Sequence, residues 1–281
     1  MMKILTILIF LLSSAFSQDA APRRITWLRN FSDAKQEAFF QSKLILIFFE
    51  RSSLEDGYRM ETETWNQSEI IDLSERFVCL RIDMQHWKSL RDQYDRMRLK
   101  FRVDVVPTTV ITDPLGNEFY HGEGFIRAAD FAKVMKALPR NLFPVYQTLR
   151  IMDEEPKSVN AKINVGIAYH RIRVAHISNK LLEEILGSDT VKQNPRLRET
   201  VGTYRAINYH LLGDLQKSVG LFEQLLDDFP NGEKQPVHLY YLAKLYLQDF
   251  KDLHARKYLN ILQKKFPESP YRKQAEDLFR K

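Results

Sequence analysis

The second half of the chain repeats itself, and this repetition limits its possible folds more than any other feature. Helical segments at 195–212 and 215–229 superimpose on segments at 236–250 and 253–266 with a spacing of 37 residues. The matching residues are Ala206 with Ala243, Tyr209 with Tyr246, Leu225 with Leu262, and Phe229-Pro230 with Phe266-Pro267. Self-similarity at such a period is typical of a helical solenoid, in which each helix pair packs against its neighbours.

Further helices extend this pattern in both directions. Segments 157–173 and 175–187 are predicted to form a first pair, in which Ala168 continues the column of small residues. Residues 269–280 are predicted to form a closing helix. Small residues in such a column let the two helices of a pair approach closely.

From Lys157 onward the chain resembles tetratricopeptide repeats. The small-residue column, the Leu212-Gly213-Asp214 turn and the Phe-Pro endings carry the resemblance. The consensus Trp is missing, and the spacing exceeds the usual period of about 34 residues. The resemblance implies an all-α helical repeat domain that binds proteins or peptides; an irregular helical bundle is the alternative.

The residues before position 139 follow a different pattern, in which strand-like runs alternate with helical ones. This alternation predicts an α/β domain with a central sheet flanked by helices. The predicted strands are 44–49, 77–83, 108–112 and 118–121, and the predicted helices are 31–41, 58–63 with 68–76, 90–100 and 128–138.

Prolines and acidic residues separate the two halves. Pro139, Pro144 and Pro156 interrupt the chain, and residues 153–155 are all acidic. We therefore predict an α/β domain at 18–143, a linker at 144–156 and the repeat domain at 157–281.

A strand–helix junction stands near the start of the α/β domain. The apolar run Leu44–Phe49 is typical of a central strand that is buried on both faces. The pair Ser53 and Asp56 has capping-box spacing, and acidic residues in a first turn suit the helix dipole. The sequence therefore predicts a helix that starts near Ser53 or Leu54.

The whole α/β domain resembles the thioredoxin fold, from about Trp27 to Leu138. The most specific segment is Val103–Glu118, VDVVPTTVITDPLGNE, which contains the Val-Pro-Thr of thioredoxin-like proteins. The resemblance implies that Val106–Pro107 is a cis bond, which an X-Pro pair adopts at modest cost. It also implies that Pro107 faces the helix start near Leu54 and that the sheet is mixed.

The same resemblance places Leu54-Glu55-Asp56-Gly57 where the family has Cys-x-x-Cys, and Ser53 where it has Trp. Thiol–disulfide exchange needs an attacking thiolate and a second thiol, so the domain is expected to be redox-inactive. Without the redox activity, the same region is a candidate binding face. Its residues are Ser53, Leu54, Glu55, Asp56, Gly57, Val106, Pro107, Thr108 and Trp87.

Trp87 belongs to a segment, 84–104, in which aromatic and basic residues alternate. We predict an amphipathic helix that packs on the sheet through Leu90, Tyr94, Met97 and Phe101. A recognition surface made of aromatic and arginine side chains is the alternative.

Cys79 is the single cysteine of the chain. It lies in an alternating run, FVCLRID, within a strand expected to be covered on both faces, so it is predicted to be a small buried apolar residue. We predict a non-catalytic protein-binding or scaffold protein. The alternative is a thiol–disulfide oxidoreductase or peroxide-handling protein that uses Cys79 or the cysteines of a partner.

The N-terminus reads as a targeting segment. Lys3 precedes an apolar run at 4–12, and Ala15 and Ser17 provide the small residues of a signal-peptidase site. We predict a signal peptide at 1–17 and an exported protein, periplasmic or secreted. The run is too short for a stable membrane span, and retention of residues 1–17 as an anchor is the alternative.

Composition and spacing argue against several other classes. The net charge of +6 is spread over 281 residues without a basic run, so nucleic acid is not an expected partner. The seven histidines show no metal-ligand spacing, and no Gly-rich phosphate loop occurs. We therefore expect no metal and no cofactor. Protein or peptide partners are expected, and the oligomeric state stays open.

Overall fold

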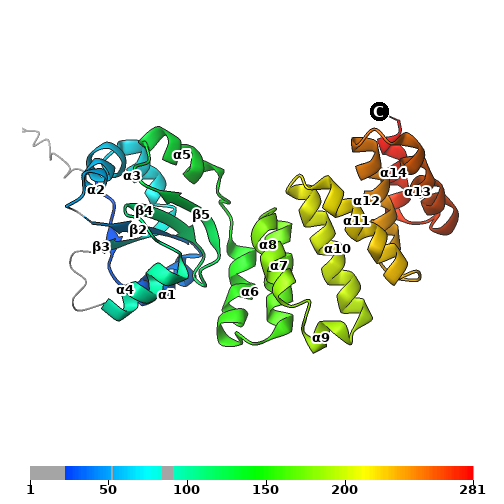
Figure 1. Cartoon of the computed structure of the whole chain (residues 1–281), viewed down its shortest axis with the longest axis horizontal. Coiled ribbons are helices and arrows are strands. Elements are labelled where there is room, and N and C mark those ends of the chain that lie inside the picture. The colour runs from blue at the N-terminus through cyan, green and yellow to red at the C-terminus, as the bar shows by residue number, and fades with distance from the viewer. Residues whose placement is uncertain (1–22, 52, 84–90, 281) are drawn as a thin grey trace, which may run out of the picture.

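The structure is a computed structural model that describes residues 23–51, 53–83 and 91–280, with only the backbone of residues 91–93. The predicted signal peptide, Trp87 and Leu90 lie outside the described residues. Figure 1 shows an α/β domain followed by a row of helices. Within the described residues, no helix combines the length and the apolar character needed to cross a bilayer.

The N-terminal domain is built on a mixed five-stranded sheet of order β1-β3-β2-β4-β5. β1, β3 and β2 run parallel to one another, whereas β4 and β5 are antiparallel additions. The mixed sheet confirms the fold class that the sequence predicted. The strands are β1 (Trp27–Leu28), β2 (Leu44–Glu50), β3 (Phe77–Asp83), β4 (Thr108–Thr112) and β5 (Glu118–Glu123).

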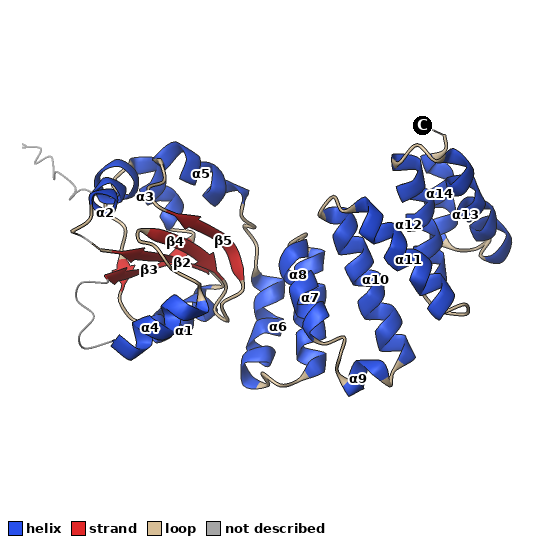
Figure 2. Ribbon diagram, viewed as in Figure 1, coloured by secondary structure: helices blue, strands red, loops and turns tan. Residues whose placement is uncertain are grey.

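Helices cover both faces of this sheet (Figure 2). On one face lie α1 (Phe31–Gln41) and α4 (Arg91–Lys100), and Tyr94, Met97 and Phe101 of the predicted amphipathic helix are buried there. On the other face lie α2, η1, α3 and α5. Their bounds are α2 (Glu55–Arg59), η1 (Met60–Trp65), α3 (Ser68–Ser74) and α5 (Ala128–Ala137).

Helix α6 (Phe143–Glu154) occupies most of the segment 144–156 that the sequence analysis predicts as a linker. Val145, Tyr146 and Leu149 of this helix are fully or almost fully buried. The Tyr146 hydroxyl donates to the carbonyl of Lys43. Because α6 has an apolar face that the sheet domain covers, it is a docked helix, and the prolines that suggested a linker only mark its start and the residues after its end.

The C-terminal half is all α-helical, as predicted. Its helices pack in consecutive pairs, α7 with α8, α10 with α11 and α12 with α13, while α14 closes the row. The bounds are α7 (Val159–Arg171), α8 (Ala175–Glu184), α9 (Asp189–Lys192), α10 (Pro195–Leu211), α11 (Leu215–Asp228), α12 (Gln235–Gln248), α13 (Asp252–Lys265) and α14 (Pro270–Leu278).

Backbone geometry fixes the register of the three pairs. The turn between the two helices of each pair contains a residue with positive φ: Arg173 at 62°, Gly213 at 83° and Phe250 at 56°. The spacings are therefore 40 residues (173 to 213) and 37 residues (213 to 250). The longer first spacing accommodates the short helix α9, which the sequence analysis did not predict.

This register corrects one predicted match. The hydroxyl of Ser178 donates to the carbonyl of Gly166 at 2.6 Å, and the hydroxyl of Ser218 donates to the carbonyl of Ala206 at 2.8 Å. Gly166, and not Ala168, therefore shares the small-residue position with Ala206 and Ala243. A Cβ atom on Gly166 would lie 2.9 Å from Leu182, which explains why this position needs a small residue.

A tyrosine recurs in the first helix of each pair, and its hydroxyl links that helix to the preceding structural unit. Tyr246 donates to Glu223 at 2.8 Å, and Tyr209 donates to Glu183 at 2.5 Å, each acceptor lying in the second helix of the preceding pair. Tyr169 has no preceding pair and donates to Asp113 of the sheet domain at 2.5 Å. The sheet domain therefore occupies the position of a preceding repeat.

Candidate functional site

The strand–helix junction lies beside the start of β4. Phe49 of β2 pairs with Thr108 of β4, so Pro107, one residue earlier, lies next to the exit of β2. Val106–Pro107 is a cis peptide bond, as the resemblance to the thioredoxin fold implied. The sheet register thus brings the junction and the cis-proline together although they are about fifty residues apart in sequence.

The helix after the junction starts close to the predicted position but lacks the predicted side-chain cap. Leu54 is the N-cap residue, with extended backbone, and among the described residues no side chain caps the first turn. The predicted capping box of Ser53 and Asp56 is therefore wrong, and the helix begins at Glu55. Glu55 and Asp56 still place negative charge in the first turn, where the helix dipole favours it.

The predicted face residues differ in exposure. Ser53 and Glu55 are exposed, Leu54 is 38% exposed, and Asp56 and Val106 are intermediate. Gly57, Pro107 and Thr108 are buried, so they shape the face without offering side-chain surface to a partner.

Two further apolar side chains are exposed beside these positions. Tyr58 is 67% exposed and Val105 is 48% exposed. Sequence reasoning missed both residues, although each directly adjoins a predicted segment. We refer to Leu54, Glu55, Asp56, Tyr58 and Val105 as the junction face.

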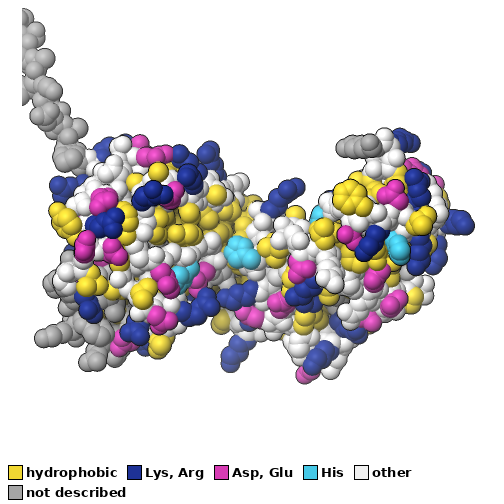
Figure 3. Space-filling view, turned by 45° about the horizontal axis from the view of Figure 1, so that its top comes forward, with side chains coloured by type: hydrophobic (Ala, Val, Ile, Leu, Met, Phe, Trp, Pro, Cys, Tyr) yellow, Lys and Arg dark blue, Asp and Glu magenta, His cyan; other side chains and the backbone are white. Residues whose placement is uncertain are grey.

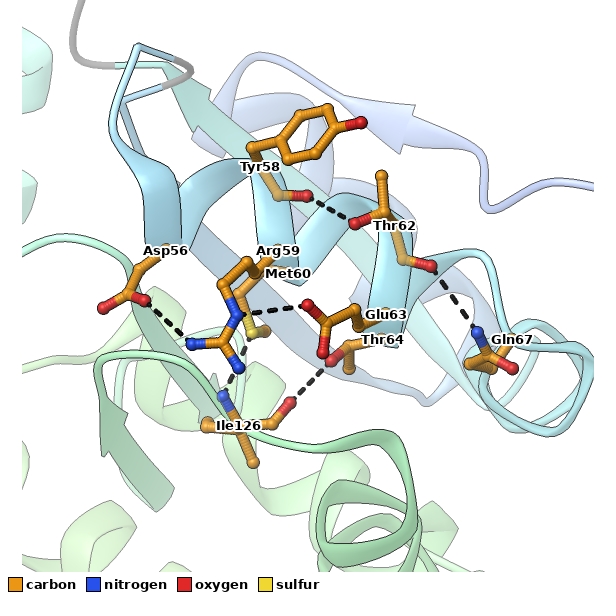
Figure 4. Close-up of polar contacts among 9 residues, drawn as sticks. All are labelled: Asp56, Tyr58, Arg59, Met60, Thr62, Glu63, Thr64, Gln67 and Ile126. Atoms are coloured by element: carbon orange, nitrogen blue, oxygen red, sulfur yellow. Dashed lines mark hydrogen bonds and ion pairs between the residues drawn. The ribbon is translucent and has the colours of Figure 1, made fainter.

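The helix behind the junction face is tied to the loop between β5 and α5 (Figure 4). The amide of Ile126 donates to the Met60 sulfur at 3.2 Å, and the Thr64 hydroxyl donates to the carbonyl of Ile126 at 2.6 Å. Gly124 of the same loop donates its amide to the carbonyl of Pro107 at 2.7 Å. These bonds join the helix, the loop and the cis-proline into one rigid wall.

Arg59 completes this wall. Its guanidinium lies 3.8 Å from the centre of the Phe125 ring and forms ion pairs with Glu63 at 3.1 Å and Asp56 at 3.5 Å. Met60–Trp65 adopt a π-helix, a rare form that often occurs at functional sites. The π-helix contains both Met60 and Thr64, the two residues that contact Ile126.

Gly57 packs closely against Arg51, the residue that follows β2. A Cβ atom at this position would lie 2.8 Å from the carbonyl oxygen of Arg51. Real Cβ atoms do not approach backbone that closely, so any side chain here would displace the chain. The position that the resemblance assigns to the second cysteine therefore has no space for one without rearrangement.

Replacing Gly57 by Ala is expected to destabilise the protein by roughly 1–3 kcal/mol, the usual cost of overpacking. Gly220 is the matched control, because it is also a helical glycine but has open space where its Cβ would lie. Gly220→Ala should instead stabilise by roughly 0.5–1 kcal/mol through helix propensity. Urea unfolding of both variants measures the difference, and equal effects would contradict the close approach of Arg51.

Glu50 of β2, Arg81 of β3 and Glu61 of η1 form a group of charged side chains near the exit of β2. Glu50 is 6% exposed and lies 3.5 Å from Arg81, which also pairs with Glu61. Burial raises the pKa of Glu50, opposed by Arg81. Because Arg81 also lies over the Trp27 ring at 4.7 Å, this group connects both strands to η1.

Cys79 lies in the middle of β3, away from the junction face. It is 4% exposed, and its sulfur is 3.8 Å from the carbonyl of Ser74. Burial raises the pKa of the thiol to about 12, although Lys43 acts in the opposite direction. The predicted burial is confirmed, and a thiol with this pKa provides almost no thiolate near neutral pH.

Elsewhere in the described part of the chain, no group of three or more His, Cys, Asp or Glu side chains is arranged to hold a metal ion. The histidines of the repeats are separated along the row of helices. The strongest arrangement for recognition in the N-terminal domain is therefore the junction face, with its exposed apolar side chains, two acidic side chains and rigid wall.

The fold and the site together define a thioredoxin-like domain without the paired cysteines, followed by helical repeats. A family model described as a thioredoxin-like domain matches residues 31–139. One described as a tetratricopeptide repeat matches residues 203–232 and 239–269. The chain therefore joins a thioredoxin-like domain to tetratricopeptide repeats, as both resemblances implied.

Two solved structures are similar to part of this chain at low identity. One, titled "DsbH Oxidoreductase", is 17% identical, with a TM-score of 0.36, and the match covers 41% of this chain and 87% of that one. The other is an uncharacterized thioredoxin-like protein from Clostridium perfringens, 19% identical, with a TM-score of 0.32 and coverage of 46% and 94%. Comparison with curated proteins found no match.

Proposed function

We propose that this protein is a non-catalytic scaffold that binds partner proteins through its thioredoxin-like domain and its repeats. The observation that carries the proposal is that the chain lacks the paired cysteines and that its single cysteine is buried. Leu54 and Gly57 stand at the positions of the paired cysteines, and Gly57 has no room for a side chain. Cys79 is buried and its pKa is raised to about 12.

The junction face supports binding of an extended segment. Leu54, Tyr58 and Val105 offer apolar surface beside the cis-proline loop, and Glu55 and Asp56 add negative charge. A partner segment with an apolar anchor next to a basic residue would complement both features. The rigid wall behind the face limits the ordering that binding requires, which favours affinity.

The alternative function, thiol–disulfide exchange or peroxide chemistry, is less well supported. Such chemistry needs an accessible thiolate, and burial opposes both the access and the ionisation of Cys79. A partner could supply cysteines of its own, but this chain would then contribute only binding. The proposal also includes export to a periplasmic or extracellular space, supported by the residue pattern of the N-terminal segment.

The redox part of the proposal is tested by thiol labelling and by insulin reduction with dithiothreitol. At pH 8, Cys79 in the native protein should react at least about 100-fold more slowly than in urea, because its thiolate fraction is far smaller. Insulin reduction should not exceed the rate with dithiothreitol alone. Fast native labelling, with turnover that Cys79→Ala abolishes, would establish the alternative function.

The binding part is tested by a photo-crosslinking residue at position 58, introduced into the full chain in its native host. Crosslinking followed by mass spectrometry should identify a defined partner, and Leu54→Glu should reduce its yield. The matched control places the same residue at position 40, because Phe40 is an 84% exposed aromatic on α1, on the opposite side of the sheet. Equal products from both positions would contradict a specific junction face.

A further inference from the structure

The sheet of the N-terminal domain ends in two edge strands, β1 and β5, which differ in how they are protected. β1 contains two residues, and a strand this short offers little backbone to a second chain. β5 contains six residues, EFYHGE, without the lysine or proline that commonly protects an edge. None of these six residues is buried, whereas all five residues of the neighbouring strand β4 are. A second chain could therefore reach the edge at β5.

The repeat domain covers the beginning of β5. The Nε2 atom of His176 is 3.2 Å from the carbonyl oxygen of Glu118, and the centre of the Phe119 ring lies 5.9 Å from that of Tyr169. Among the described elements, β4 alone packs along the length of β5. The outer edge of residues 120–123 is therefore left uncovered by these elements.

The hydrogen-bond pattern with β4 shows which backbone groups of β5 point outward. The amide of Gly124 donates to the carbonyl of Pro107 at 2.7 Å, so these two residues form a hydrogen-bonded pair of the antiparallel ladder. Such pairs alternate with pairs that are not hydrogen-bonded, and the register is regular through this part of β5. Gly122 therefore bonds to β4, whereas the N–H and C=O groups of His121 and Glu123 point away from it. Among the described residues, these four groups have no hydrogen-bond partner.

The side chains of β5 differ between the two faces of the sheet. On the α4 side, His121 lies 3.1 Å from Glu118 and 3.8 Å from Glu123, whose side chain is 56% exposed. Arg102 also lies on this side, 3.6 Å from Glu118. On the α5 side, Tyr120 is partly buried against the apolar core of the sheet domain. The edge is thus mainly acidic on one face and apolar on the other.

We propose that the outer edge of β5 binds an extended segment of a partner protein, which adds an antiparallel sixth strand to the sheet. An extended backbone can pair with the outward N–H and C=O groups in succession, and antiparallel pairing is the more stable form. Residues of the added strand opposite His121 and Glu123 should be basic, and those opposite Gly122 and Tyr120 should be apolar. The partner segment therefore alternates between basic and apolar residues.

Other occupants fit this edge less well. A second copy of the chain would bring the same carboxylates, Glu118 and Glu123, to the opposite strand, and two edges of like charge repel each other. Nucleic acid requires a basic stripe, whereas Figure 3 shows positive and negative side chains mixed over the face in view. The edge of β5 belongs neither to the junction face nor to the repeats, so this inference goes beyond the proposed function.

Hydrogen exchange of the full chain tests the open edge directly. The amides of His121 and Glu123 should exchange at least about tenfold faster than those of Tyr120 and Gly122, which bond to β4. The probe is a peptide of about seven residues in which Lys alternates with Val, a length that matches an ordinary strand. When it is added, exchange at His121 and Glu123 should slow, and exchange at Gly122 should not change. Slow exchange at all four amides of the free chain would overturn the inference.

Modified forms of the peptide, each labelled with fluorescein, test the backbone bonds and the charge. In the antiparallel arrangement the Lys amides donate to β5 and the Val amides point away from it. Methylation of the Lys amides should weaken binding by at least about tenfold, and methylation of the Val amides should have little effect. A twin with Glu in place of Lys should also bind at least about tenfold more weakly at low salt. Equal binding of the four peptides would overturn the inference.

His121→Pro tests the same bonds from the side of the protein. It removes an outward N–H and no bond to β4, so it should unfold in urea like His121→Ala but bind the Lys peptide at least about tenfold more weakly. His121→Ala is the matched control, because it keeps the N–H and should bind within about threefold of the parent. Equal binding by the two variants would overturn the inference. The methylated peptides probe the unaltered protein, so the test does not depend on folding of the proline variant.

Sedimentation of the free chain tests the competing occupant, a second copy. The chain should show no dimer that depends on this edge. A dimer that His121→Pro abolishes and His121→Ala retains would overturn the inference, in favour of pairing between two copies.

Failure of these tests is distinguishable from failure of the proposed function. The crosslinking experiment reports on position 58 of the junction face and does not depend on the edge of β5. A partner captured at position 58 together with a Lys peptide that does not bind would leave the scaffold role intact and remove only the β5 site.

Discussion

Asp113→Ala is expected to destabilise the protein by roughly 3–5 kcal/mol, because the substitution leaves several buried donors without their acceptor. Asp113 is fully buried. Its carboxylate accepts the backbone amides of Leu115 and Asn117, the side-chain amide of Asn117 and the hydroxyl of Tyr169. Three of these donors belong to the turn before β5, and the fourth belongs to the first repeat helix.

The substitution should also change how the chain unfolds. One apolar cluster extends from Leu44 of the sheet through Tyr146 of α6 to Leu181 of α8, so the sheet domain and the first repeat pair share a core. With Asp113 present, we expect both to unfold together in urea. Without it, the tryptophan signal of the sheet domain and the helical signal of the repeats should separate into two transitions.

Glu183→Ala is the matched control for Asp113→Ala. Glu183 accepts the hydroxyl of Tyr209, the residue equivalent to Tyr169, but its side chain is 42% exposed. The loss of an exposed acceptor should cost less than about 1 kcal/mol. Similar losses from the two substitutions would show that Asp113 is no more important than an ordinary contact between repeats.

The second prediction concerns acid stability and arises from a histidine in the core of the third repeat pair. His238 is fully buried, and burial, with a smaller effect of Lys234, lowers its pKa from 6.5 to about 4. The folded state thus binds fewer protons than the unfolded state. Stability from this residue is complete above pH 6.5 and is lost as the pH falls towards 4, by about 2 kcal/mol at pH 5.

His238→Val should remove this part of the acid sensitivity. Val201 is the equivalent residue in the second pair and is fully buried, so a valine suits the position. The Thr203 hydroxyl, 2.8 Å from Nε2 of His238, also donates to the carbonyl of Glu199 and stays paired. Nδ1 of His238 has no hydrogen-bond partner among the described residues, so the variant should be at least as stable as the parent at pH 7.5.

Urea unfolding at pH 7.5 and pH 5 gives the loss of unfolding free energy between the two pH values for the parent and for the variant. Subtracting one loss from the other cancels the contribution of all other titrating groups. His254→Gln provides the control, because His254 is exposed on α13. It should retain the full loss of stability between the two pH values. An unchanged loss in His238→Val would contradict the low pKa of the buried imidazole.

Several features of the site could be predicted from residues that are close in sequence or that follow a repeat. Matches such as Tyr209 with Tyr246 indicate the repeats, and the resemblance of the contiguous segment 103–118 to the thioredoxin fold implies the cis bond at Val106–Pro107. The capping box was predicted wrongly because Ser53 and Asp56 have suitable spacing, while the strand exit places Leu54 at the cap. Helix α6 was missed because its apolar face is recognisable only against the sheet that covers it.

Residue identity and periodicity are enough to predict an α/β domain without paired cysteines joined to a helical repeat, because both are properties that are read along the chain. The three-dimensional arrangement, by contrast, places Gly57 against Arg51 and brings the Tyr169 hydroxyl to Asp113, which is 56 residues away in the sequence. Such contacts depend on sheet register and helix packing, which bring together residues whose spacing in sequence carries no trace of their proximity.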